Sequence, residues 1–154
     1  MRVYLVQHGK SKSKQEDPDR SLTEEGVEEV TRMSDWLAGR GVGLSTVRHS
    51  GKRRARQTAA MLVQAIEGET RLEEIEGLAP LDDPRILAES LQQISDDVML
   101  VGHLPHLERL ASLLLTDRVE RRPVRFQNAG VVCLERGEEQ SWSLVWAQTP
   151  DLVP

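Results

Sequence analysis

Short hydrophobic runs alternate along the chain with segments in which hydrophobic residues recur every three or four positions. Residues 3–6 and 98–101 are continuous runs without a charged residue, a pattern typical of strands buried on both faces of a parallel sheet. Further strands are predicted at residues 44–48, at residues 71–75 with a weaker pattern, at residues 131–135 and at residues 142–147.

Helical periodicity fills most of the intervals between these strands. The first helix is predicted to begin after Thr23, a favourable N-cap residue, and the second to span residues 52–66. Pro84 and Pro105 suit the first turns of the other two helices. The hydrophobic positions that define the four helices are Val27, Val30, Met33 and Leu37; Ala55, Ala59, Leu62 and Ile66; Ile86, Leu87, Leu91 and Ile94; and Leu107, Leu110, Ala111 and Leu114.

This alternation of strands and helices predicts an α/β fold, a three-layer sandwich with a mostly parallel central sheet and helices on both faces. The last two predicted strands are close enough in sequence to pair as a hairpin at one edge of the sheet. With 154 residues, the chain is expected to form a single domain over residues 1–154. In such folds a ligand binds beyond the carboxyl ends of the strands.

Three of the predicted strand ends carry polar side chains suited to one ligand. Residues 7–11 read Gln-His-Gly-Lys-Ser, residues 49–58 contain four basic side chains, and residues 102–105 read Gly-His-Leu-Pro. The fold prediction brings all three segments to one edge of the sheet. Cationic groups and helix N-termini gathered there favour a phosphate ligand.

Composition narrows the function classes further. The net charge of −5 argues against a dedicated nucleic-acid-binding protein. The N-terminus has no signal-like segment and the chain has no run of about 18 hydrophobic residues, so no membrane association and a cytoplasmic location are expected. No His, Cys and Asp cluster has metal-ligand spacing, so neither a metal nor another cofactor is expected.

The three strand-end segments resemble the motifs of the histidine phosphatase superfamily. Residues 3–9 resemble the opening strand, whose family motif is Arg-His-Gly. Residues 50–58 resemble the second motif, Ser-x-x-x-Arg-Ala-x-Gln-Thr, which places its arginine at Arg54. Residues 101–105 resemble the third motif, which places the second histidine at His103.

Two further stretches resemble the SixA-type protein histidine phosphatases within that superfamily. Residues 20–26 match their Arg-x-Leu-Thr-x-x-Gly element, and residues 78–84 are similar to their mid-chain segment. The short chain also fits this subgroup, and the resemblance covers about residues 1–135. It implies a phosphoglycerate mutase-like fold and hydrolysis of a phosphoryl group carried by a protein phosphohistidine.

The resemblance also implies roles for individual residues. Neutral His8 would attack phosphorus and form a phosphohistidine, and Arg54 would bind phosphate oxygens and lower the pKa of His8. His103 would donate a hydrogen bond to another oxygen. The predicted phosphate site comprises Gln7, Gly9, Lys10, Arg54 and His103, and backbone N–H groups around Gly9 or Gly102 could supply further hydrogen bonds. The catalytic residues are His8, Arg54 and His103.

Gln7 departs from the family motif, which has arginine at this position and uses it to bind the transferring phosphoryl group. Three hypotheses follow. The chain is an active phosphatase in which Lys10 or another loop cation replaces the lost charge, or an impaired enzyme that binds phosphate or a phosphoprotein. Alternatively, it hydrolyses a small phosphate ester. A general acid stays unassigned among Glu73, Glu74 and Glu76.

Overall fold

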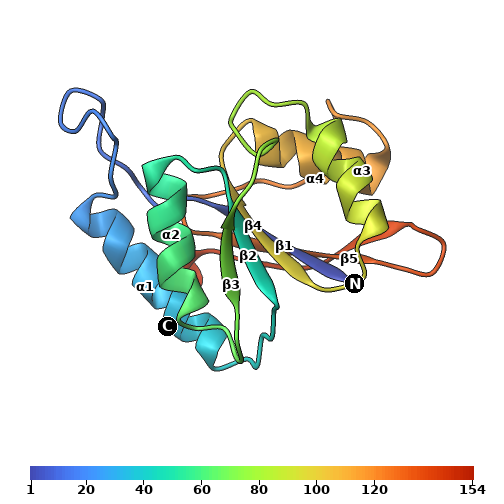
Figure 1. The fold of residues 1–154 in the computed structure, drawn as a ribbon, viewed down its shortest axis with the longest axis horizontal. Coiled ribbons are helices and arrows are strands. Elements are labelled where there is room, and N and C mark those ends of the chain that lie inside the picture. The colour runs from blue at the N-terminus through green and yellow to red at the C-terminus, as the bar shows by residue number, and fades with distance from the viewer.

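The computed structural model describes residues 1–154, and its elements follow the predicted alternation (Figure 1). In chain order they are β1 (Arg2–Gln7), α1 (Glu24–Ala38), β2 (Thr46–His49), α2 (Arg53–Val63), β3 (Arg71–Glu74), α3 (Pro84–Gln93), β4 (Val98–Gly102), α4 (His106–Thr116), β5 (Val131–Arg136), β6 (Trp142–Gln148) and the short 3₁₀ helix η1 (Pro150–Leu152).

One six-stranded sheet runs through the molecule in the order β3-β2-β4-β1-β5-β6. The first four strands of this order are parallel, and β5 and β6 add an antiparallel edge beside β1. The predicted mostly parallel sheet and the terminal hairpin are therefore confirmed. Gln7 pairs with Gly102 and His49 with Val101, so the carboxyl ends of β1, β2 and β4 lie level at one edge.

Helices cover both faces of this sheet, α1 and α2 on one side and α3 and α4 on the other (Figure 1). The side chains of β1 alternate between two hydrophobic cores: Tyr4 and Val6 pack with the first helix pair, and Val3 and Leu5 with the second. Because both faces are covered, each residue of the strand is buried whichever way it points. This explains the uninterrupted hydrophobic run and confirms the three-layer sandwich.

Two of the hydrophobic positions that predicted the helices are exposed in the structure, and for Val27 the predicted common face with Val30 is wrong. Val27 is 41% exposed, and the buried face of α1 instead passes through Gly26, Val30, Met33 and Leu37. Ile86 is 58% exposed although its neighbour Leu87 is buried. Both residues lie in the first turn of a helix, where hydrophobic spacing alone does not fix which side of the helix meets the sheet.

Element ends also differ from the sequence prediction by a few residues. The helix predicted over residues 52–66 ends at Val63 because a turn follows, and Pro105 precedes α4 as its N-cap rather than lying within its first turn. None of the helices combines the length and the hydrophobicity that crossing a bilayer requires.

Candidate active site

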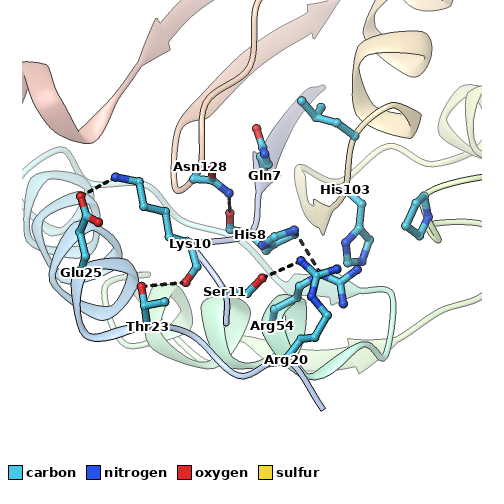
Figure 2. A pocket seen from close by; sticks show the side chains of 12 residues that line it. Gln7, His8, Lys10, Ser11, Arg20, Thr23, Glu25, Arg54, His103 and Asn128 are labelled. Atoms are coloured by element: carbon cyan, nitrogen blue, oxygen red, sulfur yellow. Dashed lines mark hydrogen bonds and ion pairs between the residues drawn. The ribbon is translucent and has the colours of Figure 1, made fainter. Parts of the chain in front are cut away.

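A pocket of about 630 Å³ lies at the carboxyl ends of β1 and β4, where the fold rule predicts a ligand (Figure 2). Five predicted site residues line it together: Gln7, His8, Lys10, Arg54 and His103. Arg20 and Asn128 line it as well, although the sequence had given neither of them a role. Nearly all of the lining is polar, as suits a charged ligand.

His8 follows the last residue of β1 and is only 9% exposed. Its Nδ1 lies 2.6 Å from the carbonyl oxygen of Gly9. A carbonyl can only accept, so this contact assigns the ring proton to Nδ1. Nε2 then carries the lone pair, and the Arg54 Nε–H donates to it over 3.3 Å. His8 is thus held as a neutral imidazole with its nucleophilic nitrogen facing Arg54.

The surroundings of His8 also keep it unprotonated. The pKa of His8 is lowered to about 4, chiefly by burial and also by the positive charges of Arg54 and Arg20, against an opposing contribution from the hydrogen bond to Gly9. The ring is therefore neutral at pH 7, the state that a nucleophilic histidine requires.

Arg54 and Arg20 present two guanidinium groups on the same side of His8 (Figure 2). Arg54 comes from the first turn of α2, and Arg20 from the loop that precedes α1. The Arg20 Nη2 group donates to Ser11 Oγ over 3.2 Å. Neither guanidinium takes part in any ion pair. Two adjacent cations without a carboxylate partner form a site for an anion.

Lys10 lies on the other side of His8, and its ammonium group points away from the ring toward α1 (Figure 2). Its Nζ lies 2.5 Å from Glu25 Oε1 and 2.9 Å from Glu29 Oε1. The charge that we had expected to replace the missing arginine is therefore neutralised by two carboxylates. Arg20, which the same loop also contributes to the pocket lining, takes part in no ion pair.

Gly9 also differs from the expectation. Its backbone N–H, predicted to bind phosphate, donates to Thr58 Oγ1 over 3.0 Å. A Cβ atom on Gly9 would lie 2.8 Å from Val30 Cγ2, so the glycine is required where β1 leaves the sheet against α1. The residue supports the site by close packing.

His103 follows β4 and forms the opposite wall of the pocket. Its ring centroid lies 5.0 Å from that of His8, and its Nε2 lies 2.6 Å from Ser50 Oγ. Its Nδ1 has no partner within the protein. Burial, with the nearby His8 and Arg54, lowers the pKa of His103 to about 3. His103 is therefore a neutral side chain that can donate only one ring hydrogen bond.

Residues of two motifs, together with Asn128, hold the loops around the site in place. Gln57 Oε1 accepts from the Leu22 backbone N–H over 2.8 Å, and the Asn128 side chain donates to the His8 carbonyl over 2.9 Å. Thr23 caps α1 by accepting from the Gly26 N–H, and a Cβ on Gly26 would collide with the Lys10 carbonyl oxygen. The element at residues 20–26 thus fixes the loop that carries Arg20.

Gln7 extends into the pocket, and its Oε1 is buried without a hydrogen-bond partner. Its backbone carbonyl accepts from the Ala129 N–H over 2.9 Å, which fixes the strand end but leaves the amide unsatisfied. Because Oε1 can only accept a hydrogen bond, the Nε2 group is the part of this side chain that can donate to a phosphoryl oxygen in the pocket.

The three glutamates considered for a general acid lie outside the pocket. Glu73 pairs with Arg48 and Arg71, while Glu74 and Glu76 line a neighbouring groove. Glu25, already paired with Lys10, is the carboxylate that lines the pocket itself. No group of three or more His, Cys, Asp or Glu side chains is arranged to hold a metal ion.

Comparisons with known proteins agree with this geometry. The sequence model of the histidine phosphatase superfamily (branch 1) matches residues 3–81, a segment that contains Gln7, His8 and Arg54. The phosphohistidine phosphatase SixA of Escherichia coli strain K12 is 24% identical over 155 residues, which cover 97% of this chain and 94% of the relative.

Solved structures show the same architecture. The protein histidine phosphatase SixA complexed with tungstate matches with a TM-score of 0.86, at 23% identity and over 100% of both chains. The putative phosphohistidine phosphatase SixA from Agrobacterium tumefaciens matches with a TM-score of 0.77, at 27% identity and over 97% of both chains.

Proposed function

The chain belongs to the histidine phosphatase superfamily, and on that premise we propose that it hydrolyses the phosphohistidine of a phosphorylated protein, with His8 as the nucleophile. The observation that carries this proposal is the arrangement around His8. A neutral imidazole has its lone pair on Nε2, and two guanidinium groups without carboxylate partners lie on the same side.

In the first step, His8 Nε2 forms a bond to phosphorus while the bond from phosphorus to the nitrogen of the substrate imidazole breaks and its electron pair stays on that nitrogen. Arg54 and Arg20 stabilise the negative charge on the equatorial phosphoryl oxygens. The Gln7 amide and a ring N–H of His103 supply neutral hydrogen bonds. Because cationic side chains neutralise the charge, no metal ion is needed for this step.

In the second step, water attacks phosphorus and the bond to His8 Nε2 breaks, which releases inorganic phosphate and restores the neutral ring. A substrate imidazole that is protonated on its second nitrogen has already left as a neutral molecule in the first step. Both hydrogens of the attacking water therefore stay on the phosphate, which is released as H2PO4⁻, and atoms and charge balance over the cycle. A strong general acid is then unnecessary, which suits a pocket whose carboxylate, Glu25, is paired with Lys10.

Two observations favour a protein-borne phosphohistidine over a small ester. The similarity to the E. coli phosphohistidine phosphatase extends over 97% of this chain and 94% of that protein. The pocket is lined by the loops that follow β1 and β4, by the first turns of α1 and α2, and by Pro80 and Asn128, and a chain of 154 residues leaves little material for a closed cover over a small substrate.

The proposal is tested by measuring release of phosphate from a protein phosphorylated on histidine with phosphoramidate, and from p-nitrophenyl phosphate. We expect wild-type protein to hydrolyse the phosphohistidine with a higher kcat/KM than the ester, and His8→Ala to be inactive on both. Equal rates for wild type and His8→Ala would exclude the mechanism. A preference for the ester would instead support a small-molecule phosphatase.

Gln7 favours a second candidate, a phosphoprotein-binding protein with impaired turnover. Loss of one preorganised transition-state donor lowers kcat by about 10²–10³. If Arg20 fulfils the role of the missing arginine, Gln7→Arg changes kcat by less than about tenfold. An increase of several orders of magnitude in Gln7→Arg would favour the impaired protein.

A further inference from the structure

A second groove, of about 760 Å³, lies directly beside the catalytic pocket. The two cavities meet at Ser50, which lines the groove and is hydrogen bonded to His103 of the pocket. They also share a loop, in which Pro80 lines the pocket and Ala79 and Asp82 line the groove. A chain bound with its phosphohistidine in the pocket can therefore continue into the groove.

The groove carries negative charge that the protein does not neutralise. Glu74 and Glu76 line it, both are exposed, and neither takes part in an ion pair. Asp82 adds a third carboxylate, which accepts the backbone N–H of Ala79 over 2.9 Å. Gly51 lets the Glu74 side chain lie against the backbone, because a Cβ there would be 2.2 Å from Glu74 Oε1. The groove is thus complementary to a cationic side chain.

Exposed hydrophobic side chains border the same groove. Leu81 is 84% exposed, more than any other large hydrophobic residue of the chain, and it lies between pocket-lining Pro80 and groove-lining Asp82. Ile86, on the first turn of α3, lines the groove and is 58% exposed. Large exposed hydrophobic residues next to a reactive site are typical of a protein-binding surface.

We propose that this groove binds the segment of the partner protein that flanks its phosphohistidine, a segment with a Lys or Arg side chain and a hydrophobic neighbour. The proposal rests on the proposed function and adds what the site recognises besides the phosphoryl group. Arg20 and Arg54 take the anion, while Glu74 and Glu76 take a cation on the other side of Ser50. Since an extended chain spans about 3.3–3.6 Å per residue, the cation lies within a few residues of the phosphohistidine.

Two phosphohistidine peptides test this assignment. Both have ten residues and one histidine phosphorylated with phosphoramidate, and the four residues that flank the histidine are lysine in one and glutamate in the other. We expect wild-type protein to favour the lysine peptide by about tenfold in kcat/KM, the scale of one or two exposed ion pairs. The double variant Glu74→Lys/Glu76→Lys should lose this preference and keep its rate on free phosphoramidate.

The matched control reverses two glutamates at the opposite end of the sheet. Glu138 and Glu139 are exposed in the turn after β5, which runs antiparallel to β1 and so ends far from the pocket. Glu138→Lys/Glu139→Lys makes the same change in net charge and should keep the preference for the lysine peptide. Leu81→Ser should raise KM for both peptides and leave hydrolysis of phosphoramidate unchanged.

The outcomes separate this inference from the proposed function. If wild type hydrolyses both peptides equally well, or if the Glu74/Glu76 double variant keeps the full preference, the groove assignment is overturned and the phosphatase proposal stands. If neither peptide is hydrolysed, the proposed function fails. Fluorescence anisotropy of labelled peptides on the His8→Ala background then still decides whether the groove selects the lysine peptide, because it requires no turnover.

Discussion

Positively charged side chains lie on both sides of His8, but only the one on the Lys10 side is paired with carboxylates. On one side, the guanidinium groups of Arg20 and Arg54 have no carboxylate partner; on the other, the Lys10 ammonium is held between Glu25 and Glu29. Arg20 and Lys10 even come from the same loop. A count of basic residues near a site therefore says little about its affinity for an anion, which depends on whether each charge is already neutralised.

The difference has a structural origin in the residues that follow the loop. The carboxylates of Glu25 and Glu29 lie on α1, one turn apart, and both face the Lys10 side chain. The Arg20 side chain, in contrast, donates only to neutral acceptors, Ser11 Oγ and the Lys12 carbonyl. Lys10 thus holds the loop against α1, and Arg20 is available to bind a ligand in the pocket.

The largest effect is expected at Arg54, the cation that touches His8. Arg54→Lys keeps the charge but loses the planar fork and the Nε–H that donates to His8 Nε2, and Arg54→Ala loses both. We expect kcat on p-nitrophenyl phosphate to fall by about 10³ in the alanine variant. Steady-state kinetics measure this, with Arg53→Gln as the control, since Arg53 is a neighbour that pairs with Asp19. A loss of less than tenfold in Arg54→Ala would remove Arg54 from the mechanism.

A smaller loss is expected at Arg20, which lies farther from the nucleophile. Arg20→Gln should lower kcat/KM by about 10–10² and weaken inhibition by orthovanadate to a similar extent. Circular dichroism and thermal unfolding would separate this effect from collapse of the loop, because the variant also loses the hydrogen bonds to Ser11 and Lys12. Unchanged kinetics in a folded variant would mean that a group other than Arg20 replaces the arginine that the family motif has at the position of Gln7.

Much of the fold follows from the sequence because its signals are local. Continuous hydrophobic runs at β1 and β4 identify strands that are covered on both faces, and Thr23 marks where α1 begins. The exposure of Val27 and Ile86 could not be predicted, since it depends on how the first turn of a helix meets the sheet. Strand order in the sheet is likewise a property of tertiary packing.

The sequence predicted most residues of the candidate site, but not which of its charged side chains pair with one another. His8, Arg54 and His103 each follow a strand end, and parallel strands bring such ends together. The sequence could not show that Lys10 is paired with carboxylates while Arg20 is not. The pairing of Lys10 depends on side chains of α1 that are 15 and 19 residues away in sequence. Arg20 carried one usable signal, its place in the element at residues 20–26, whose other members cap α1 and pack against Lys10.

The pKa of His8 offers another test of the difference between Arg20 and Lys10. An NMR titration should give His8 a pKa of about 4, and Arg20→Gln should raise that pKa by removing a nearby positive charge. Burial is the largest cause of the shift, so the pKa should stay below the usual 6.5 in that variant. Lys10→Met should leave it unchanged. A pKa near 6.5 in wild type would contradict the burial of the ring.

The same shift affects stability, and its sign follows from proton uptake. Between pH 6.5 and about 4 the unfolded chain protonates this histidine and the folded chain does not, so the unfolded state binds more protons. The free energy of unfolding should therefore fall as the pH drops through this window, by about 2 kcal/mol at pH 5 for His8 alone. Urea unfolding of wild type and His8→Asn at pH 7 and pH 5 measures the difference.

The smallest effect on catalysis is expected at Lys10, the paired cation. Lys10→Met removes the ammonium group and keeps the length of the side chain, so the pocket retains both free guanidinium groups. We expect kcat/KM to stay within about threefold of wild type, the scale on which exposed ion pairs usually act. Lys14→Met, an exposed position of the same loop, is the matched control for removal of a positive charge. A loss in Lys10→Met as large as that in Arg20→Gln would show that Lys10 leaves Glu25 and Glu29 when an anion binds. The cations on both sides of His8 would then bind the anion, Lys10 only after leaving its carboxylate partners. Lys10 and Arg20 would together replace the arginine that the family motif has at the position of Gln7.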